Sequence, residues 1–167
     1  MQYVCNWETM ATRASSDVGR LEDACRAQGL PVTTQRRAIY EVLAERTDHP
    51  TADQIWEVAR ERLPELSRTT VYRVLDTFVK LGVANKTPNV GAAVRFDPRT
   101  ERHHHAVCRE CDRVVDVEST TLDRIRIPAT DDIGFEVDDY SVHIRGLCAA
   151  CRRRRSRRER TRQNKEE

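Results

Sequence analysis

The spacing of apolar residues predicts a series of helices along the first half of the chain. A short helix is expected over residues 17–29, and Gly29 ends it. A second helix follows the N-cap residue Thr33, with apolar residues at helical spacing at Ala38, Ile39, Val42 and Leu43. Residues 1–16 have no such periodicity, so we expect them to be a disordered N-terminal extension.

Capping signals define two further helices. Thr51 and Gln54 fit a capping box, in which each side chain binds the other residue's backbone N–H. The helix that follows presents Ile55, Val58, Ala59 and Leu63, and Pro64 ends it. Ser67 or Arg68 begins a fourth helix, and Gly82 suits its C-terminal cap. The inward positions of this fourth helix are Val71, Val74, Leu75, Phe78 and Leu81.

A hairpin follows these helices. Val83–Thr87 and Ala92–Phe96 are predicted strands, joined by a turn over Pro88–Gly91. Helices followed by a hairpin are typical of a winged helix-turn-helix, in which the third and fourth helices form the turn unit. We therefore assign residues 17–96 to a winged-helix DNA-binding domain.

The pattern changes at Asp97 to short elements around a Cys-x-x-Cys turn. The expected elements are strands at Ala106–Cys108, Val114–Val117 and Phe135–Ile144, and a short helix at Thr121–Ile127 cut by Pro128. Residues 97–151 thus form a second small α/β domain, and the fold class is α+β.

The formal net charge is +2, but the charged residues are unevenly distributed along the chain. Residues 97–151 carry twelve acidic against seven basic residues, whereas the basic C-terminal tail, 152–167, carries nine basic against three acidic. The acidic domain suits a cation, and the tail suits either phosphate or a solvated, disordered end. No apolar run approaches the roughly 18 residues of a membrane helix, and no secretory pattern opens the chain, so no membrane partner and a cytoplasmic location are expected.

The start of the fourth helix carries the side chains expected to read DNA. The first turn of such a helix enters the major groove, where hydroxyls and guanidinium groups bind phosphates or bases and an aromatic ring meets a thymine methyl. The candidates are Ser67, Arg68, Thr69, Thr70, Tyr72 and Arg73, with Arg36, Arg37 and Arg95 as secondary phosphate contacts. In the alternative reading, Tyr72 packs internally and the arginines are solvated.

Four of the six cysteines form two Cys-x-x-Cys pairs about forty residues apart. This spacing suits a tetrahedral structural Zn²⁺ bound by Cys108, Cys111, Cys148 and Cys151. A domain of some fifty residues has little core, so the metal would contribute to folding. The alternatives are a redox dithiol or buried free thiols.

Three consecutive histidines precede the first pair. On an extended segment, His103 and His105 face one way and His104 the other. His103 and His105 can therefore share a metal. A site shared with His49, Asp97 and Asp116 would give those three residues a common role and would bridge the two domains.

The sequence resembles the ferric uptake regulator family from about residue 20 to 151. The motifs that carry the resemblance are Thr34-Gln35-Arg36-Arg37, His49-Pro50-Thr51-Ala52-Asp53, Thr70-Val71-Tyr72-Arg73, Arg95-Phe96-Asp97, His103-His104-His105-Ala106-Val107-Cys108-Arg109-Glu110-Cys111, Val114-Val115-Asp116 and Gly146-Leu147-Cys148-Ala149-Ala150-Cys151.

This resemblance implies a metal-dependent transcriptional repressor that binds a double-stranded DNA operator as a homodimer. The second domain would then be the metal-binding dimerisation domain, with structural zinc on the four cysteines. The family's regulatory metal site maps onto His49, Asp97, His103, His105 and Asp116.

The resemblance also bears on the signal. Three histidines and two carboxylates suit Fe²⁺ or Mn²⁺, whereas zinc-uptake members usually add a cysteine. Iron-uptake members commonly carry glutamate where this chain has Asp116, and the peroxide-responsive members carry aspartate. Peroxide sensing is therefore the favoured hypothesis. Tyr140 replaces a histidine of a further family metal site, which is expected to be absent or incomplete, and Pro128 shortens a helix that is longer in typical members.

Three other functions compete with peroxide sensing. The first alternative is an iron, manganese or zinc uptake regulator, which has the same fold but responds to a different signal. A zinc metalloenzyme needs an open coordination position and a placed general base, whereas five protein ligands are available here and the sequence has no His-Glu-x-x-His helix, so the chain is not expected to be an enzyme. A zinc-ribbon module without DNA binding is the third alternative.

Overall fold

The computed structural model describes residues 18–87, 93–127 and 134–166 of the chain. These residues divide into two compact units, 1–100 and 101–167. The predicted disordered extension and the hairpin turn at Pro88–Gly91 lie outside the described residues, as does Pro128. No helix in the described part of the chain is long and apolar enough to cross a membrane.

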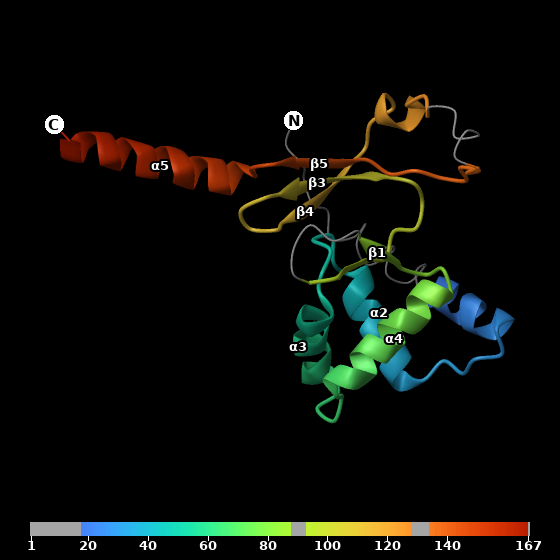
Figure 1. Cartoon of the computed structure of the whole chain (residues 1–167). Coiled ribbons are helices and arrows are strands. Elements are labelled where there is room, and N and C mark those ends of the chain that lie inside the picture. The colour runs from blue at the N-terminus through green and yellow to red at the C-terminus, as the bar shows by residue number, and fades with distance from the viewer. Residues whose placement is uncertain (1–17, 88–92, 128–133, 167) are drawn as a thin grey trace. The chain divides into compact units, whose positions relative to one another are not determined.

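The first unit is a set of helices with a two-stranded sheet (Figure 1). Residues 18–27 are helical, followed by α2 (Thr34–Ala44), α3 (Ala52–Arg62) and α4 (Arg68–Lys80). Strands β1 (Asn85–Thr87) and β2 (Arg95–Asp97) pair antiparallel. This element order is a winged helix-turn-helix, as the sequence predicts, with both strands of the wing shorter than expected.

Local chemistry explains where the helices begin and end. Thr33 accepts a hydrogen bond from the backbone N–H of Arg36, and Thr51 forms the predicted capping box with Gln54. Ser67 caps α4 through the backbone N–H of Thr70. Gly82 follows α4 with a φ of 67°, which glycine adopts without steric cost.

The core of the first unit is apolar and continuous. It unites the inward faces of all its helices with Phe96 of β2, and Tyr40 packs edge-on against Phe78 with ring centroids 5.3 Å apart. Four of the five predicted inward positions of α4 are buried, namely Val71, Val74, Leu75 and Phe78. Burial of aromatic and aliphatic side chains of this size stabilises the unit without any metal.

The second unit is a three-stranded sheet followed by a helix. Strands β3 (His104–Cys108) and β4 (Val114–Val117) pair antiparallel, and β5 (His143–Gly146) pairs parallel to β3 on its other side. Helix α5 (Ala149–Glu166) continues from β5 beyond the sheet (Figure 1). The sequence predicts β3 and β4 but neither the parallel pairing nor α5.

Two predicted elements of this unit are wrong in extent. The expected helix at Thr121–Ile127 is a single 3-10 turn, η1 (Leu122–Arg124), whose N-cap makes no side-chain hydrogen bond. So short a segment cannot offset the cost of starting a helix.

The expected strand at Phe135–Ile144 begins only at His143. The register pairs His143 with His105, near the start of β3. Because the pairing is parallel, most of the preceding segment extends beyond the first residue of β3 and finds no neighbouring strand in the described residues.

Candidate metal centres and DNA-reading surface

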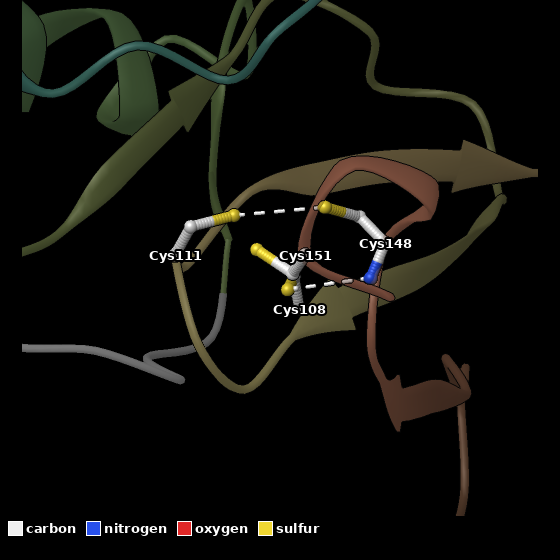
Figure 2. A group of neighbouring side chains, drawn as sticks. All are labelled: Cys108, Cys111, Cys148 and Cys151. Atoms are coloured by element: carbon white, nitrogen blue, oxygen red, sulfur yellow. Dashed lines mark hydrogen bonds between the residues drawn. The ribbon is translucent and has the colours of Figure 1, made fainter. Parts of the chain in front are cut away.

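The strand register brings the two cysteine pairs together. Cys108 ends β3 opposite Gly146 of β5, and Cys111 lies in the turn that follows β3. Cys148 precedes α5, and Cys151 lies in its first turn. The parallel β3–β5 pairing thus places two segments forty residues apart at one point (Figure 2).

The four sulfurs have the geometry of a tetrahedral zinc site. All four lie within 4.8 Å of one another, and the Sγ atoms of Cys111 and Cys148 are 3.8 Å apart. A zinc–sulfur distance of about 2.3 Å places tetrahedral sulfurs about 3.8 Å apart. All four cysteines are free thiols rather than disulfides. The residues present therefore fit a structural Zn²⁺.

The four thiols differ in how readily they lose their protons. The backbone N–H of Cys148 donates to Sγ of Cys108 at 3.3 Å (Figure 2), and with the backbone of Glu110 this lowers the pKa of Cys108 to about 6. The guanidinium of Arg154 donates to Sγ of Cys151 at 2.8 Å, which lowers the pKa of that thiol, but burial and the neighbouring sulfurs raise it to about 12. A bound divalent cation would offset the repulsion among the four sulfurs and so allow all four thiols to lose their protons.

The first unit holds a buried histidine and aspartate side by side. Nε2 of His49 lies 3.5 Å from Oδ2 of Asp97, and both side chains are almost fully buried. The neighbouring backbone fixes this pair, because the N–H of Phe96 donates to the carbonyl of Pro50 at 2.9 Å. The guanidinium of Arg95, a predicted phosphate contact, donates to the carbonyl of His49 at 2.9 Å and so supports the histidine.

The second unit holds two histidines and an aspartate around one point. The Nε2 atoms of His103 and His105 are 2.9 Å apart, and Oδ1 of Asp116 lies 3.7 Å and 3.9 Å from them respectively. The register explains the cluster, because His105 pairs with Asp116 across the β3–β4 ladder. Paired residues share a face of the sheet, and His103 shares it through strand alternation.

A backbone contact determines which nitrogen of His103 is available. Nδ1 of His103 lies 2.8 Å from the carbonyl oxygen of Glu101, which can only accept a hydrogen bond. Nδ1 therefore donates to this carbonyl, which in the neutral imidazole leaves the lone pair on Nε2, the nitrogen that faces His105. This is the usual arrangement behind a metal-binding histidine.

His104 lies on the opposite face of β3, as alternation predicts. Its Nδ1 accepts from the backbone N–H of Val142 at 3.1 Å, and its Nε2 lies 3.1 Å from Oδ1 of Asp123. Nearby, the hydroxyl of Tyr140 donates to the carbonyl of Leu122 at 2.8 Å, and the guanidinium of Arg102 lies over the Tyr140 ring. These side chains hold the sheet to η1 and its neighbours.

His143 is a further histidine beside this cluster, and no local sequence pattern indicates it. Its ring stacks on His105 with centroids 5.4 Å apart, because the two residues are partners across the β3–β5 ladder. Burial and the neighbouring histidines lower the pKa of His143, which favours its neutral form. Only the unpredicted β5 register could have identified it.

The predicted DNA-reading side chains lie at the start of α4. Ser67, Arg68, Thr69, Tyr72 and Arg73 are exposed, and Tyr72 in particular is 47% exposed, so it does not pack in the core. The guanidinium of Arg68 lies 4.5 Å from the Trp56 ring centroid. Arg36 and Arg37 begin α2, where they contact the carbonyl of Pro31 and the carboxylate of Glu22 respectively.

Comparison with known proteins identifies the family of this chain. The sequence model of the ferric uptake regulator family matches residues 27–145. The chain belongs to the ferric uptake regulator family. This membership agrees with the winged helix, the thiol site and the His/Asp cluster described above.

Individual relatives give a narrower comparison within the ferric uptake regulator family. The peroxide-responsive repressor PerR of Staphylococcus saprophyticus is 33% identical over 79% of this chain and 91% of its own. The peroxide operon regulator of Bacillus subtilis is 33% identical over 83% of this chain and 95% of its own. The ferric uptake regulator of Vibrio cholerae has a solved structure that matches with a TM-score of 0.63 and 26% identity, over 75% of this chain and 98% of its own.

Proposed function

We propose that the chain is a repressor that binds its operator as a homodimer while Fe²⁺ or Mn²⁺ is bound, and releases it when peroxide meets bound iron. Residues 17–96 would form the DNA-binding domain and residues 97–151 the dimerisation domain. The observation that carries the proposal is the cluster of His103, His105 and Asp116 in one unit, together with the buried pair of His49 and Asp97 in the other.

These two groups would hold one metal ion jointly. Three imidazoles and two carboxylates supply five nitrogen and oxygen ligands, a set that suits Fe²⁺ or Mn²⁺ better than zinc. A metal that requires ligands from both units would favour one arrangement of them. Its binding would then be coupled to DNA binding through a free energy shared between the two sites.

Two observations support peroxide as the signal, namely the ligand set and the names of two relatives. Asp116 is an aspartate rather than the longer glutamate that iron-uptake members commonly carry. Two relatives at 33% identity carry names that specify a peroxide response. Bound Fe²⁺ would supply the electron transfer that activates peroxide. The chain's own part is to present an imidazole, of His49 or His103, which gains one oxygen atom while peroxide is reduced to water.

Oxidation of a ligand would release the operator. An oxidised imidazole is a poor metal ligand, so the units would lose their shared ion and the arrangement that binds DNA. Mn²⁺ would hold the same arrangement without this chemistry. The family is one of regulators and the sequence has no His-Glu-x-x-His helix, so we infer that the chain is a regulator rather than an enzyme, and that it acts in the cytoplasm.

The dimer would form through the second unit. Its exposed apolar side chains include Val115 and Ile144, which both pair with Ala106 and thus form one row across the sheet. Phe135 is 63% exposed in the same unit. A second copy of the chain is the occupant we propose for this apolar surface, because the resemblance to the ferric uptake regulator family implies a homodimer.

The test is mass spectrometry of the full chain loaded with Fe²⁺ and treated with stoichiometric peroxide. We expect a gain of one oxygen on a peptide that contains His49 or His103, in parallel with loss of operator binding. The Mn²⁺-loaded chain is the matched control and should gain none. If the iron-loaded chain releases DNA without oxidation, or keeps both peptides unchanged, an iron or manganese uptake regulator becomes the better account.

A further inference from the structure

Helix α5 is the most strongly charged feature of the chain. Between residues 152 and 163 it carries eight arginines and a single acidic residue, Glu159, and every one of these side chains is exposed. The match to the ferric uptake regulator family ends at residue 145, before α5 begins. The function proposed above assigns no role to this helix.

The helix has no apolar face. None of residues 152–163 is apolar, so α5 can neither pack against a core nor insert into a bilayer as an amphipathic helix does. At about 100° per residue the eight arginines are distributed around the whole circumference of the helix. A partner with negative charge on more than one side fits this distribution.

Most of the positive charge of α5 has no acidic partner among the described residues. Arg155 forms an ion pair with Glu159 at 2.9 Å, and Arg154 donates to Cys151. In the described part of the chain, no ion pair is formed by the other six, Arg152, Arg153, Arg157, Arg158, Arg160 and Arg162. Several of these arginines lie three or four residues apart, where like charges destabilise a helix. Phosphate groups would relieve this repulsion.

The thiol site positions the helix. Cys151 lies in the first turn of α5, and the backbone N–H of Arg152 donates to the carbonyl of Cys148 at 2.9 Å. The arginines therefore begin directly after two of the four proposed zinc ligands. A helix anchored at one end holds its charges along a defined axis, unlike a flexible tail.

From these observations we propose that α5 is a second DNA-binding element that contacts the phosphate backbone. The proposal rests on the proposed function, since an operator-binding repressor has duplex DNA as its polyanionic partner. The major groove, about 12 Å wide and lined by phosphates on both sides, accepts a helix whose arginines point in all directions. The contacts would be independent of base sequence, because arginine reads phosphate by charge and hydrogen bonding.

The experiment measures how DNA affinity depends on salt. In one full-length variant the six arginines without ion pairs become glutamine, which keeps helix propensity and removes charge. In the matched control the same six become lysine, which keeps the charge. Each variant and the parent, loaded with Zn²⁺ and Mn²⁺, are titrated against an operator selected in vitro with the parent, and against a duplex of scrambled sequence. Zinc content confirms that each variant is folded.

Each phosphate contact contributes about 0.9 to the slope of log affinity against log salt. We expect the glutamine variant to lose about 3 or more from this slope on both duplexes, and the lysine variant to retain it. An unchanged slope in the glutamine variant, with the parent binding its operator in a metal-dependent way, would overturn the inference. The inference would also be overturned if the glutamine variant kept the slope but lost binding to phosphatidylserine vesicles. That result would identify a membrane surface as the partner of α5.

The same titrations separate this inference from the proposed function. If the parent shows no metal-dependent preference for any selected duplex, the repressor function fails. The scrambled duplex still reports on α5 in that case, because a smaller slope for the glutamine variant supports phosphate binding and an equal slope refutes it.

Discussion

The two units of the chain are stabilised by different kinds of contact. The first unit buries a continuous apolar core that includes Tyr40, Phe78 and Leu75. Among the described residues of the second unit, the buried apolar side chains are only Val107, Cys108, Val114 and Cys151, and the other buried side chains are the three histidines. The first unit can therefore fold on hydrophobic burial alone, whereas the centre of the second consists of metal-ligand chemistry.

Removal of zinc should show the largest difference between the units. We expect Cys148→Ser to lose the ion and the ordered sheet of the second unit, because structural zinc contributes on the order of 10 kcal/mol to such domains. Amide hydrogen exchange, with zinc content measured alongside, should show loss of protection in β3–β5 and retention in α2–α4. Cys25→Ala, at a buried cysteine of the first unit, is the control and should keep its zinc. Full protection of the second unit without zinc would contradict this account.

A core truncation should produce the opposite pattern. Phe78 is fully buried and packs against Tyr40, so Phe78→Ala should lower the free energy of unfolding of the first unit by about 3–5 kcal/mol. Thermal unfolding should show this loss equally with and without zinc. Tyr72→Ala, on the exposed face of the same helix, should change stability by less than about 0.5 kcal/mol. A loss that depends on zinc would mean that the units are not separately stabilised.

Lengthening the side chain of Asp116 by one methylene should separate metal binding from peroxide sensing. Asp116→Glu keeps a carboxylate but displaces it, and we expect ligand oxidation to slow by roughly 10- to 100-fold because the reaction depends on close positioning. Metal-dependent DNA binding should persist, as measured by mobility shift. The control is Asp123→Glu, on the His104 face of the sheet. Equal oxidation rates in parent and variant would remove Asp116 as the basis for peroxide sensing.

The smallest expected effect is at a helix cap. Thr51→Ala removes half of the capping box of α3 and should cost about 1 kcal/mol in the first unit. Chemical denaturation measures this loss, and the second unit should keep its zinc. Thr33→Ala, at the cap of α2, should cost a similar amount. A larger loss at Thr51 alone would indicate that the cap also supports His49, two residues earlier.

The fold was predictable where local signals determine it. Thr33 and Thr51 mark helix starts through side-chain hydrogen bonds to nearby backbone, and the structure confirms both caps. It also decides between Ser67 and Arg68 for the start of the fourth helix, because Ser67 caps α4. The second unit depends on contacts distant in sequence, so its prediction was less complete. The parallel register of β5 on β3 has no local signal in the sequence. The true extent of the strand and the position of His143 beside His105 therefore could not be predicted.

The site residues were predictable as chemical types rather than as a geometry. Cys-x-x-Cys spacing indicates zinc by itself, and alternation along β3 separates His104 from its neighbours. The tautomer of His103 depends on the carbonyl of Glu101, and the support of His49 by Arg95 depends on tertiary contact. Helix α5 was missed because no apolar periodicity accompanies its arginines.

The central claim is that one metal ion is held by ligands from both units. The most direct measurement is the stoichiometry and affinity of Mn²⁺ for the zinc-loaded chain, compared with His49→Ala in the first unit and His105→Ala in the second. We predict one Mn²⁺ per chain, and a loss of affinity of at least tenfold in either variant, because each removes a ligand of the same ion. Unchanged Mn²⁺ affinity in His49→Ala would contradict the claim, since the second unit would then bind its metal alone.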